Sequence, residues 1–225
     1  MEAGRVGREA DVAPAPAAAE PTGGRLAGWT PADPGPLGLA GFAGTTFVLS
    51  MYNANLINSG GTFVVLALAL AYGGLAQLLA GMWEFRTGNT FGAVAFTSYG
   101  AFWISYFLLV KAVIVPKLIA PGALDNAIAV YLYMWAIFTT YMFVASLRTT
   151  GAVALVFLLL AATFWILGIG NAQLSGTLKA TNGTIKFGGW VGLVTAVAAW
   201  YASFAAVTNS TFGRVVLPVF PLRRT

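Results

Sequence analysis

Residues 34–83 read PGPLGLAGFAGTTFVLSMYNANLINSGGTFVVLALALAYGGLAQLLAGMW, a run of fifty positions without one charged side chain. A helix needs about 20 largely apolar residues to cross the roughly 30 Å hydrocarbon layer of a bilayer. The run is therefore long enough for two such helices, and the polar segment 53–61 between its halves predicts the loop that joins them. The sequence predicts a chain embedded in a membrane.

Four further charge-free runs follow, each long enough for one span, at 87–110, 126–147, 149–178 and 187–213. A segment surrounded by lipid satisfies its own backbone hydrogen bonds only as a helix, and the alternating ten-residue segments of an outer-membrane barrel are missing. We therefore expect an all-α integral membrane protein with six transmembrane helices, at about 36–56, 62–84, 92–114, 127–147, 151–171 and 188–209.

The chain ends predict two tails around a six-helix transmembrane domain at 34–212. Residues 1–33 are rich in Ala, Pro, Gly and charge and lack apolar periodicity, which indicates a disordered cytoplasmic tail, and 213–225 form a second cytoplasmic tail. All eight arginines fall on one side of the predicted spans and all four lysines on the other. The larger basic excess marks the cytoplasmic side, so we expect a multi-pass protein of the plasma membrane with both termini in the cytoplasm.

The composition excludes several functions. The chain is 58% hydrophobic and 8% charged, whereas an ordinary soluble domain has about a quarter of its residues charged. Cys and His are both absent, which removes thiol chemistry, the commonest general base and the commonest metal ligand. Glu84 beside Arg86 is read as an interfacial charged loop, with a proton relay as the alternative. We expect no catalytic residue, metal, cofactor or nucleic-acid partner, and no enzyme.

The predicted spans carry neutral polar and aromatic side chains instead. Phe96, Tyr99, Trp103 and Tyr106 share one face of the third span. Taken alone, the polar residues can be explained by interhelical hydrogen bonds, and the aromatic residues by helix packing. Together they favour a narrow conduit for a small, weakly charged organic solute rather than for bare metal cations. The candidate lining residues are Thr45, Thr46, Asn55, Gln77, Asn89, Thr97 and Asn171.

Particular motifs carry a resemblance to a known family. The stretch Asp33-Pro-Gly-Pro-Leu-Gly-Leu39 resembles the Asn-Pro-Ala-Pro-Leu-Gly-Leu signature of the acetate uptake transporter family, the succinate–acetate permeases. Further blocks follow in the same order along the chain: Tyr72-Gly-Gly-Leu-Ala-Gln77, Gly88-Asn-Thr-Phe-Gly92, Ala95-Phe-Thr-Ser-Tyr-Gly-Ala-Phe-Trp103, Ile169-Gly-Asn171 and Phe212-Gly-Arg-Val-Val-Leu-Pro218. The colinear series spans about 34–218, everything except the tails.

The resemblance implies a homo-hexamer in the lipid bilayer, with a pathway through each protomer for acetate and often succinate or other short mono- and dicarboxylates. It implies a constriction formed by Phe42, Tyr99 and Leu160, and a residue that shapes substrate choice at Ala199. The family signature at the pathway mouth maps to Asp33, Pro34, Pro36, Leu37, Gly38 and Leu39. Asp33 departs from the family Asn: an ionised carboxylate only accepts hydrogen bonds and repels an anion.

Two transport mechanisms remain open from the sequence. A channel-like pore needs no titratable relay, whereas a proton-coupled pathway needs either co-transport of the acid form or a carboxylate such as Glu84 or Asp33. In either case we expect Lys111, Lys117, Lys179 and Lys186 to raise the carboxylate concentration at the outer mouth, with simple snorkelling to the membrane interface as the alternative. We also expect the Tyr99 hydroxyl to help pass the anion. The alternative from another class is a non-transporting membrane sensor or assembly protein.

Overall fold

The computed structural model describes residues 29, 31–177 and 181–222, which are helical apart from turns, loops and one isolated β-bridge. In chain order the elements are α1 (Gly35–Asn53), the 3₁₀ helix η1 (Ser59–Gly61), α2 (Val64–Leu70), the π-helix η2 (Ala71–Ala76), α3 (Gln77–Thr87), α4 (Thr90–Leu108), the π-helix η3 (Leu109–Ile114), α5 (Pro121–Ser146), α6 (Gly151–Leu174) and α7 (Gly183–Phe212). The all-α prediction is confirmed. The predicted N-terminal tail lies outside the described residues except at 29 and 31–33.

Five of the six predicted spans are long and apolar enough to cross a membrane: 64–87, 90–114, 122–146, 151–174 and 183–212. The first two of these run without interruption through the π-helical segments η2 and η3. The remaining predicted span corresponds to α1, which is 19 residues long and carries a glycine at every third position from Gly35 to Gly44. Those glycines lower its hydropathy but allow close helix contacts.

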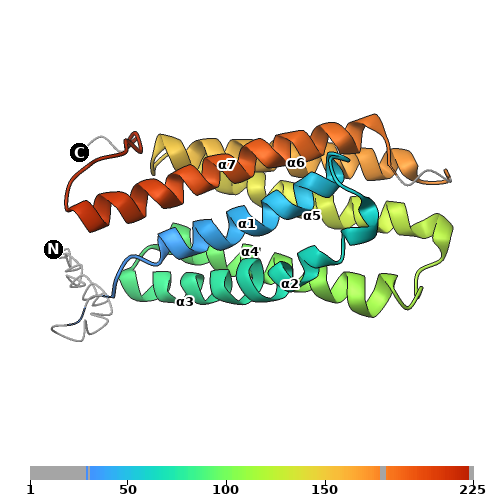
Figure 1. The fold of residues 1–225 in the computed structure, drawn as a ribbon, viewed down its shortest axis with the longest axis horizontal. Helices are drawn as coiled ribbons and strands as arrows, with labels where there is room; N and C mark the ends of the chain where they lie inside the picture. Colours follow the sequence, from blue (N-terminus) through green and yellow to red (C-terminus); the bar gives the residue numbers. More distant parts are fainter. Residues whose placement is uncertain (1–28, 30, 178–180, 223–225) are drawn as a thin grey trace, which may run out of the picture. The chain divides into compact units, whose positions relative to one another are not determined.

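The six spans lie side by side (Figure 1), and α1 lies between α7 and α3. On one side α7 packs against α6 and α6 against α5, while on the other α3 packs against α4. Contacts between α4 and α5 close the ring, so the described helices enclose a common interior.

The contact between α1 and η2 requires glycine at Gly41. A Cβ built there would lie 2.7 Å from the carbonyl oxygen of Tyr72, which cannot rotate out of the way as a side chain can. The π-helical turn brings that carbonyl close to α1, and π-bulges often mark functional regions of helices. The small-residue pattern in the sequence therefore serves helix packing here.

Local capping explains where three of the helices begin. The Asn89 side chain accepts a hydrogen bond from Gly92 N at 3.1 Å, Thr150 from Val153 N at 3.3 Å, and Asn182 from Ile185 N at 2.8 Å. These contacts satisfy backbone donors that a helix N-terminus otherwise leaves free. At the other ends of α3 and α7, Gly88 and Gly213 adopt the left-handed conformation that favours glycine.

Residues 214–222 form a C-terminal strap that turns back from the end of α7 towards the start of α6 (Figure 1). Gly151 N donates to Phe220 O at 2.7 Å, and Leu222 N donates to Thr149 O at 3.0 Å. The Asn209 side chain anchors the strap from α7, because its Oδ1 accepts from Val216 N and Leu217 N and its Nδ2 donates to Leu217 O. The residues predicted as a C-terminal tail are therefore packed against the bundle as far as 222.

Replacing Asn209 with alanine should release the strap. The change removes three hydrogen bonds of 2.7–2.9 Å, at a cost of about 2–3 kcal/mol locally. We expect trypsin to cleave the purified protein after Arg214 at least about tenfold faster than in the wild type, because local opening exposes the bond. The exposed Asn126 provides the control, Asn126→Ala. Equal cleavage rates for Asn209→Ala and wild type would show that the side chain does not hold the strap.

Candidate functional site

Two cavities of similar size lie among the described helices of the bundle. Cavity A has a volume of about 330 Å³ and is lined by α1, α4, η3, α5, α6 and α7, with Phe42, Leu160 and Asn171 among its residues. Cavity B has a volume of about 340 Å³ and is lined by residues from the start of α1, the end of α3, the starts of α4 and α6, the end of α7 and the strap. The two cavities share no lining residue.

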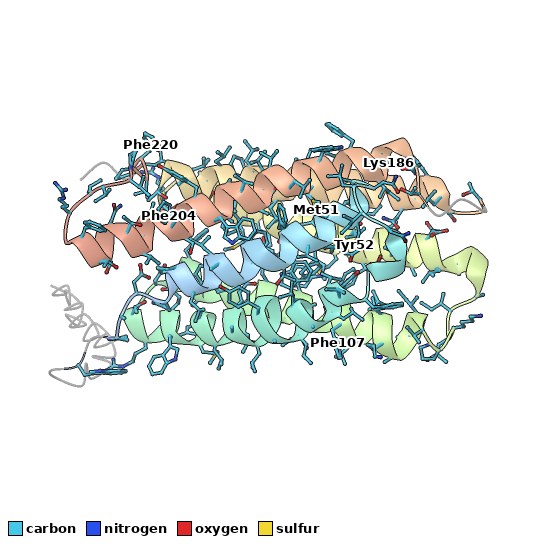
Figure 2. The ribbon with its side chains drawn as sticks, viewed as in Figure 1. Met51, Tyr52, Phe107, Lys186, Phe204 and Phe220 are labelled. Atoms are coloured by element: carbon cyan, nitrogen blue, oxygen red, sulfur yellow. The ribbon has the colours of Figure 1, made fainter. Side chains whose placement is uncertain are left out.

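The cavities lie towards opposite ends of the bundle. Asn53 and Asn171, near the C-terminal ends of α1 and α6, line cavity A, whereas Asp33 and Thr150, before the N-terminal ends of the same helices, line cavity B. Figure 2 shows Tyr52 and Lys186 at the first end and Phe204 and Phe220 at the second. An axis from one end of the protein to the other therefore passes through both cavities.

A buried apolar cluster separates the cavities. Phe42 and Leu160 line cavity A and Phe157 lines cavity B, and each is at most 6% exposed. The Tyr99 ring lies between, with its centroid 5.9 Å from that of Phe42 and 6.0 Å from that of Phe157. Ala199 of α7 belongs to the same cluster and is fully buried. The structure thus brings together all four residues that the resemblance assigned to the constriction and to substrate choice.

The Tyr99 hydroxyl faces neither cavity, contrary to the expectation that it helps pass the anion. It lies 2.9 Å from Thr139 Oγ1, and Thr139 donates its own proton to Trp135 O at 2.7 Å. Thr139 must therefore accept from Tyr99, which leaves the tyrosine no proton to offer a passing anion. The ring of Tyr99 belongs to the separating cluster, whereas its hydroxyl fixes the ring to α5.

The predicted polar residues divide into two groups. Thr46 and Asn171 line cavity A and Asn89 lines cavity B. Four others line neither cavity, for reasons that only the structure supplies. Thr45 donates to Gly41 O, Asn55 is exposed beyond the end of α1, and Gln77 and Thr97 are packed against the glycines Gly41 and Gly81 of neighbouring helices. Amides and hydroxyls in a span thus do not by themselves indicate a pathway.

The family signature lies at the entrance of cavity B, where Asp33, Pro36 and Leu39 line the wall. Pro34 and Pro36 begin α1, Leu37 is exposed, and Gly38 packs under the Phe96 ring. Asp33 Oδ1 accepts a hydrogen bond from Gly35 N at 2.9 Å, which caps the turn into the helix. Pro36 O accepts from Ser203 Oγ at 2.7 Å, so α7 fixes the position of this entrance.

Glu84, expected in an interfacial charged loop, lies instead inside α3. It is 2% exposed and lines cavity B. Its Oε2 accepts hydrogen bonds from Asn89 Nδ2 at 2.9 Å and from Thr87 Oγ1 at 3.1 Å. Asp33 is close by, because a Cβ built at Gly35 lies 3.0 Å from Asp33 Oδ1 and 3.5 Å from Glu84 Oε1. Cavity B therefore contains two carboxyl groups.

Three further site residues escaped the sequence reasoning. Phe157 lies three residues before Leu160 on the same face of α6, a spacing that would have found it. Asn209 and the strap residue Val219 line cavity B from the C-terminal end, and no local pattern distinguishes them. Their role follows from the chain folding back, which only the tertiary structure shows.

Comparisons with known proteins show which family the sequence matches. A sequence model described as the GPR1/FUN34/yaaH family matches residues 21–224. Acetate permease A of Emericella nidulans is 41% identical over 195 residues, which cover 84% of this chain and 65% of that protein. The succinate-acetate/proton symporter SatP of Escherichia coli strain K12 is 40% identical over 191 residues, which cover 84% of this chain and 95% of that protein.

A solved structure also resembles this fold. The structure described as the bacterial acetate channel SatP matches with a TM-score of 0.74 at 39% identity, over 84% of this chain and 99% of that one. The matched part of the chain therefore spans almost the whole length of the bacterial relatives but less than two thirds of the length of the fungal permease.

Proposed function

This chain belongs to the GPR1/FUN34/yaaH family, a family of membrane transporters and channels, and from that premise we propose that it carries acetate across the membrane. Succinate and other short carboxylates are its further substrates. The observation that carries the proposal is the pair of cavities at opposite ends of the bundle, separated only by the cluster around Phe42, Tyr99 and Leu160. We propose that no enzymatic step accompanies this movement.

Each part of the pathway has a physical task. A bare carboxylate loses its hydration on entering hydrocarbon, so the cavities must supply polar partners in place of water. Asn171 in cavity A and Asn89 in cavity B are placed to do so. The apolar cluster between them excludes hydrated ions by size and poor wetting. Passage requires one of its side chains to rotate, because the cavities share no lining residue.

We propose that this protomer assembles as a homo-hexamer in the plasma membrane with both termini in the cytoplasm. The described arginines Arg86, Arg148 and Arg214 lie at the end of cavity B, and the described lysines Lys111, Lys117 and Lys186 at the end of cavity A. The basic residues of short cytoplasmic loops orient membrane proteins, so cavity B faces the cytoplasm. The lysines at the opposite mouth then attract carboxylates, although none of the three lines cavity A.

The decisive test is flux through the purified protein in liposomes, with protein-free liposomes as the correction for acetic acid that crosses lipid unaided. Isotope uptake of acetate and succinate above that background supports the proposal. Absence of such uptake from correctly folded protein contradicts it and favours the sensor or assembly protein. Current in planar bilayers then separates the two mechanisms, since an anion channel reverses at the acetate equilibrium potential whereas one-to-one symport with a proton carries no current.

Replacing Glu84 with glutamine should raise acetate uptake at neutral pH and flatten its pH dependence. A carboxylate about 5 Å from a passing acetate opposes it by about 3 kcal/mol at an effective dielectric constant of 20. Protonation removes that repulsion, so the wild type should speed up on acidification, whereas Glu84→Gln should be fast throughout and about a hundredfold faster than wild type at pH 7.5. Glu84→Asp keeps the charge and should keep the pH response. An unchanged pH profile in Glu84→Gln would exclude the residue from any proton coupling.

A further inference from the structure

Ser50 of α1 differs in its hydrogen bonding from the other buried serines of the described spans. It is 4% exposed and lines cavity A, yet its hydroxyl forms no hydrogen bond within the part of the chain that the structure describes. Serine and threonine hydroxyls inside helices usually donate to a nearby carbonyl. The buried serines and threonines that donate to a carbonyl in this way are Thr45, Thr139, Ser146, Thr163, Thr195 and Ser203.

The Ser50 hydroxyl is also accessible, whereas the hydroxyl of Thr46, one turn earlier, is not. Thr46 Oγ1 is one of the fully enclosed polar atoms that lack a partner among the described residues, and Ser50 Oγ is not. Because Ser50 is otherwise buried and lines cavity A, its small accessible surface faces that cavity. An accessible hydroxyl without a protein partner can bind a ligand there.

Gly192 of α7 provides the space that the Ser50 hydroxyl occupies. A Cβ built at Gly192 would overlap Ser50 Oγ and would lie 3.5 Å from Thr163 Cγ2 of α6. Thr163 also lines cavity A. The hydroxyl therefore lies in the cavity wall where α1, α6 and α7 meet, and it depends on the absence of a side chain at Gly192.

The position of Ser50 places it between the mouth of cavity A and the constriction. It follows Phe42 by eight residues on α1, which corresponds to about 12 Å along the helix axis. Asn53 and Asn171, at the C-terminal ends of α1 and α6, line the cavity on the other side of Ser50. A solute that enters at this end meets the Ser50 hydroxyl before it reaches the Phe42 ring.

The charge of cavity A limits which ligand fits. Among the described residues no Lys or Arg lines it, and its only carboxyl side chain is Asp125, early in α5. A dianion would meet this carboxylate without a countercharge, which costs about twice the repulsion that a monoanion meets. A neutral donor such as a hydroxyl suits a singly charged carboxylate, because conduction requires binding that is weak enough to reverse.

We propose that Ser50 Oγ donates a hydrogen bond to the carboxylate of a singly ionised organic acid in cavity A, and that Gly192 is the positioning residue that leaves room for this hydroxyl. The inference rests on the proposed transport function and names the group that holds the substrate before the constriction.

The first test is Ser50→Ala, which removes the hydroxyl and leaves the rest of the wall in place. A hydrogen bond to a charged group contributes about tenfold or more to binding, so the half-saturating acetate concentration for uptake into proteoliposomes should rise about tenfold. Ser146→Ala is the matched control. It makes the same change at a buried serine that donates to Phe143 O and lines neither cavity, and it should leave half-saturation unchanged.

The second test is Gly192→Ala, which displaces the hydroxyl without deleting it. The Ser50 side chain can rotate away from the new methyl group and donate to the Thr46 carbonyl, so the fold should survive and half-saturation should again rise. If Gly192 acts through Ser50, adding Gly192→Ala to Ser50→Ala should change half-saturation by less than about twofold. Additive effects of the two changes would overturn the role of Gly192.

Acetate binding to the detergent-solubilised protein, followed by ligand-detected NMR, separates this inference from the proposed function. Weaker binding in Ser50→Ala than in wild type and Ser146→Ala supports the site, even if no flux is found. Equal binding and equal half-saturation in these three proteins overturn it while leaving acetate transport intact. A lower maximal rate with unchanged half-saturation would also overturn it, because that pattern reflects packing. Wild-type protein that neither binds nor transports acetate overturns both.

Discussion

Phe42→Ala should relax the size limit at the constriction, raising lactate and butyrate uptake relative to acetate by about tenfold or more. The Phe42 ring is 4% exposed, closes cavity A and lies 5.9 Å from the Tyr99 ring. One methylene more or less on a substrate changes the discrimination of a close-fitting pocket between two substrates by about 10–200-fold. The Phe42 ring has a larger volume than the atoms that lactate has in addition to those of acetate, so its removal should make room for lactate. Removing it enlarges cavity A beside Leu160 and leaves the Tyr99 ring as the remaining aromatic barrier towards Phe157 and cavity B.

The measurement is initial uptake of labelled acetate, lactate and butyrate by proteoliposomes. Loss of a buried Phe also costs about 3–5 kcal/mol of stability, so size-exclusion chromatography must show that the variant is folded. Phe204→Ala is the matched control, because Phe204 is 60% exposed on the outer face of α7 (Figure 2) and reaches neither cavity. Wild-type selectivity in a folded Phe42→Ala variant would remove Phe42 from the constriction, and Leu160→Ala and Tyr99→Ala would then be tested in the same way.

Gly189→Ala should prevent α1 and α7 from packing, and we expect little folded protein. A Cβ at this position overlaps the backbone of Asn53 and Ala54 at the end of α1. Backbone atoms cannot rotate away, so the helices must separate along the contact that positions Phe42 and Ala199. Forcing atoms into a packed interior costs about 1–3 kcal/mol or more, which outweighs the gain of up to about 1 kcal/mol from replacing a helical glycine by alanine.

Fluorescence-detected size-exclusion chromatography over a temperature ramp measures this effect. A loss of 3 kcal/mol would lower the melting temperature by about 6–12 °C in a domain of this size. Gly183→Ala is the matched control, because nothing lies within 4 Å of a Cβ at Gly183 in the first turn of the same helix. A Gly189→Ala variant as stable as Gly183→Ala would mean that the two helices are further apart than the structure shows.

Hydropathy could predict the spans because lipid imposes the same requirement on every segment that crosses it. The charge-free runs therefore gave six helices, and five of them meet the length and apolarity of a span without any tertiary information. The helix ends were less accurate: α5 begins at Pro121 rather than near 127, and α7 at Gly183 rather than near 188. Asn182 sets the start of α7 through a single hydrogen bond, and a proline in the first turn sets the start of α5; hydropathy registers neither.

The candidate site could be predicted only where a motif carried it. The residues assigned by resemblance, Phe42, Tyr99, Leu160 and Ala199, lie in one buried cluster. The residues chosen for polarity alone were divided between cavity walls and helix contacts. Thr45 and Thr46 are adjacent and chemically identical, yet successive helical positions point about 100° apart, so one bonds its own helix and the other lines cavity A.

The amino-acid sequence by itself therefore determined the membrane location, the number of helices and the family, because each depends on composition or on order along the chain. The tertiary structure alone decided that Glu84 is buried in cavity B, that the strap contributes Val219 to it, and that the Tyr99 hydroxyl is occupied by Thr139. These properties arise from contacts between segments 40 or more residues apart or from the packing of neighbouring helices. Hydrogen-bond satisfaction and burial are properties of such contacts, and no single segment specifies them.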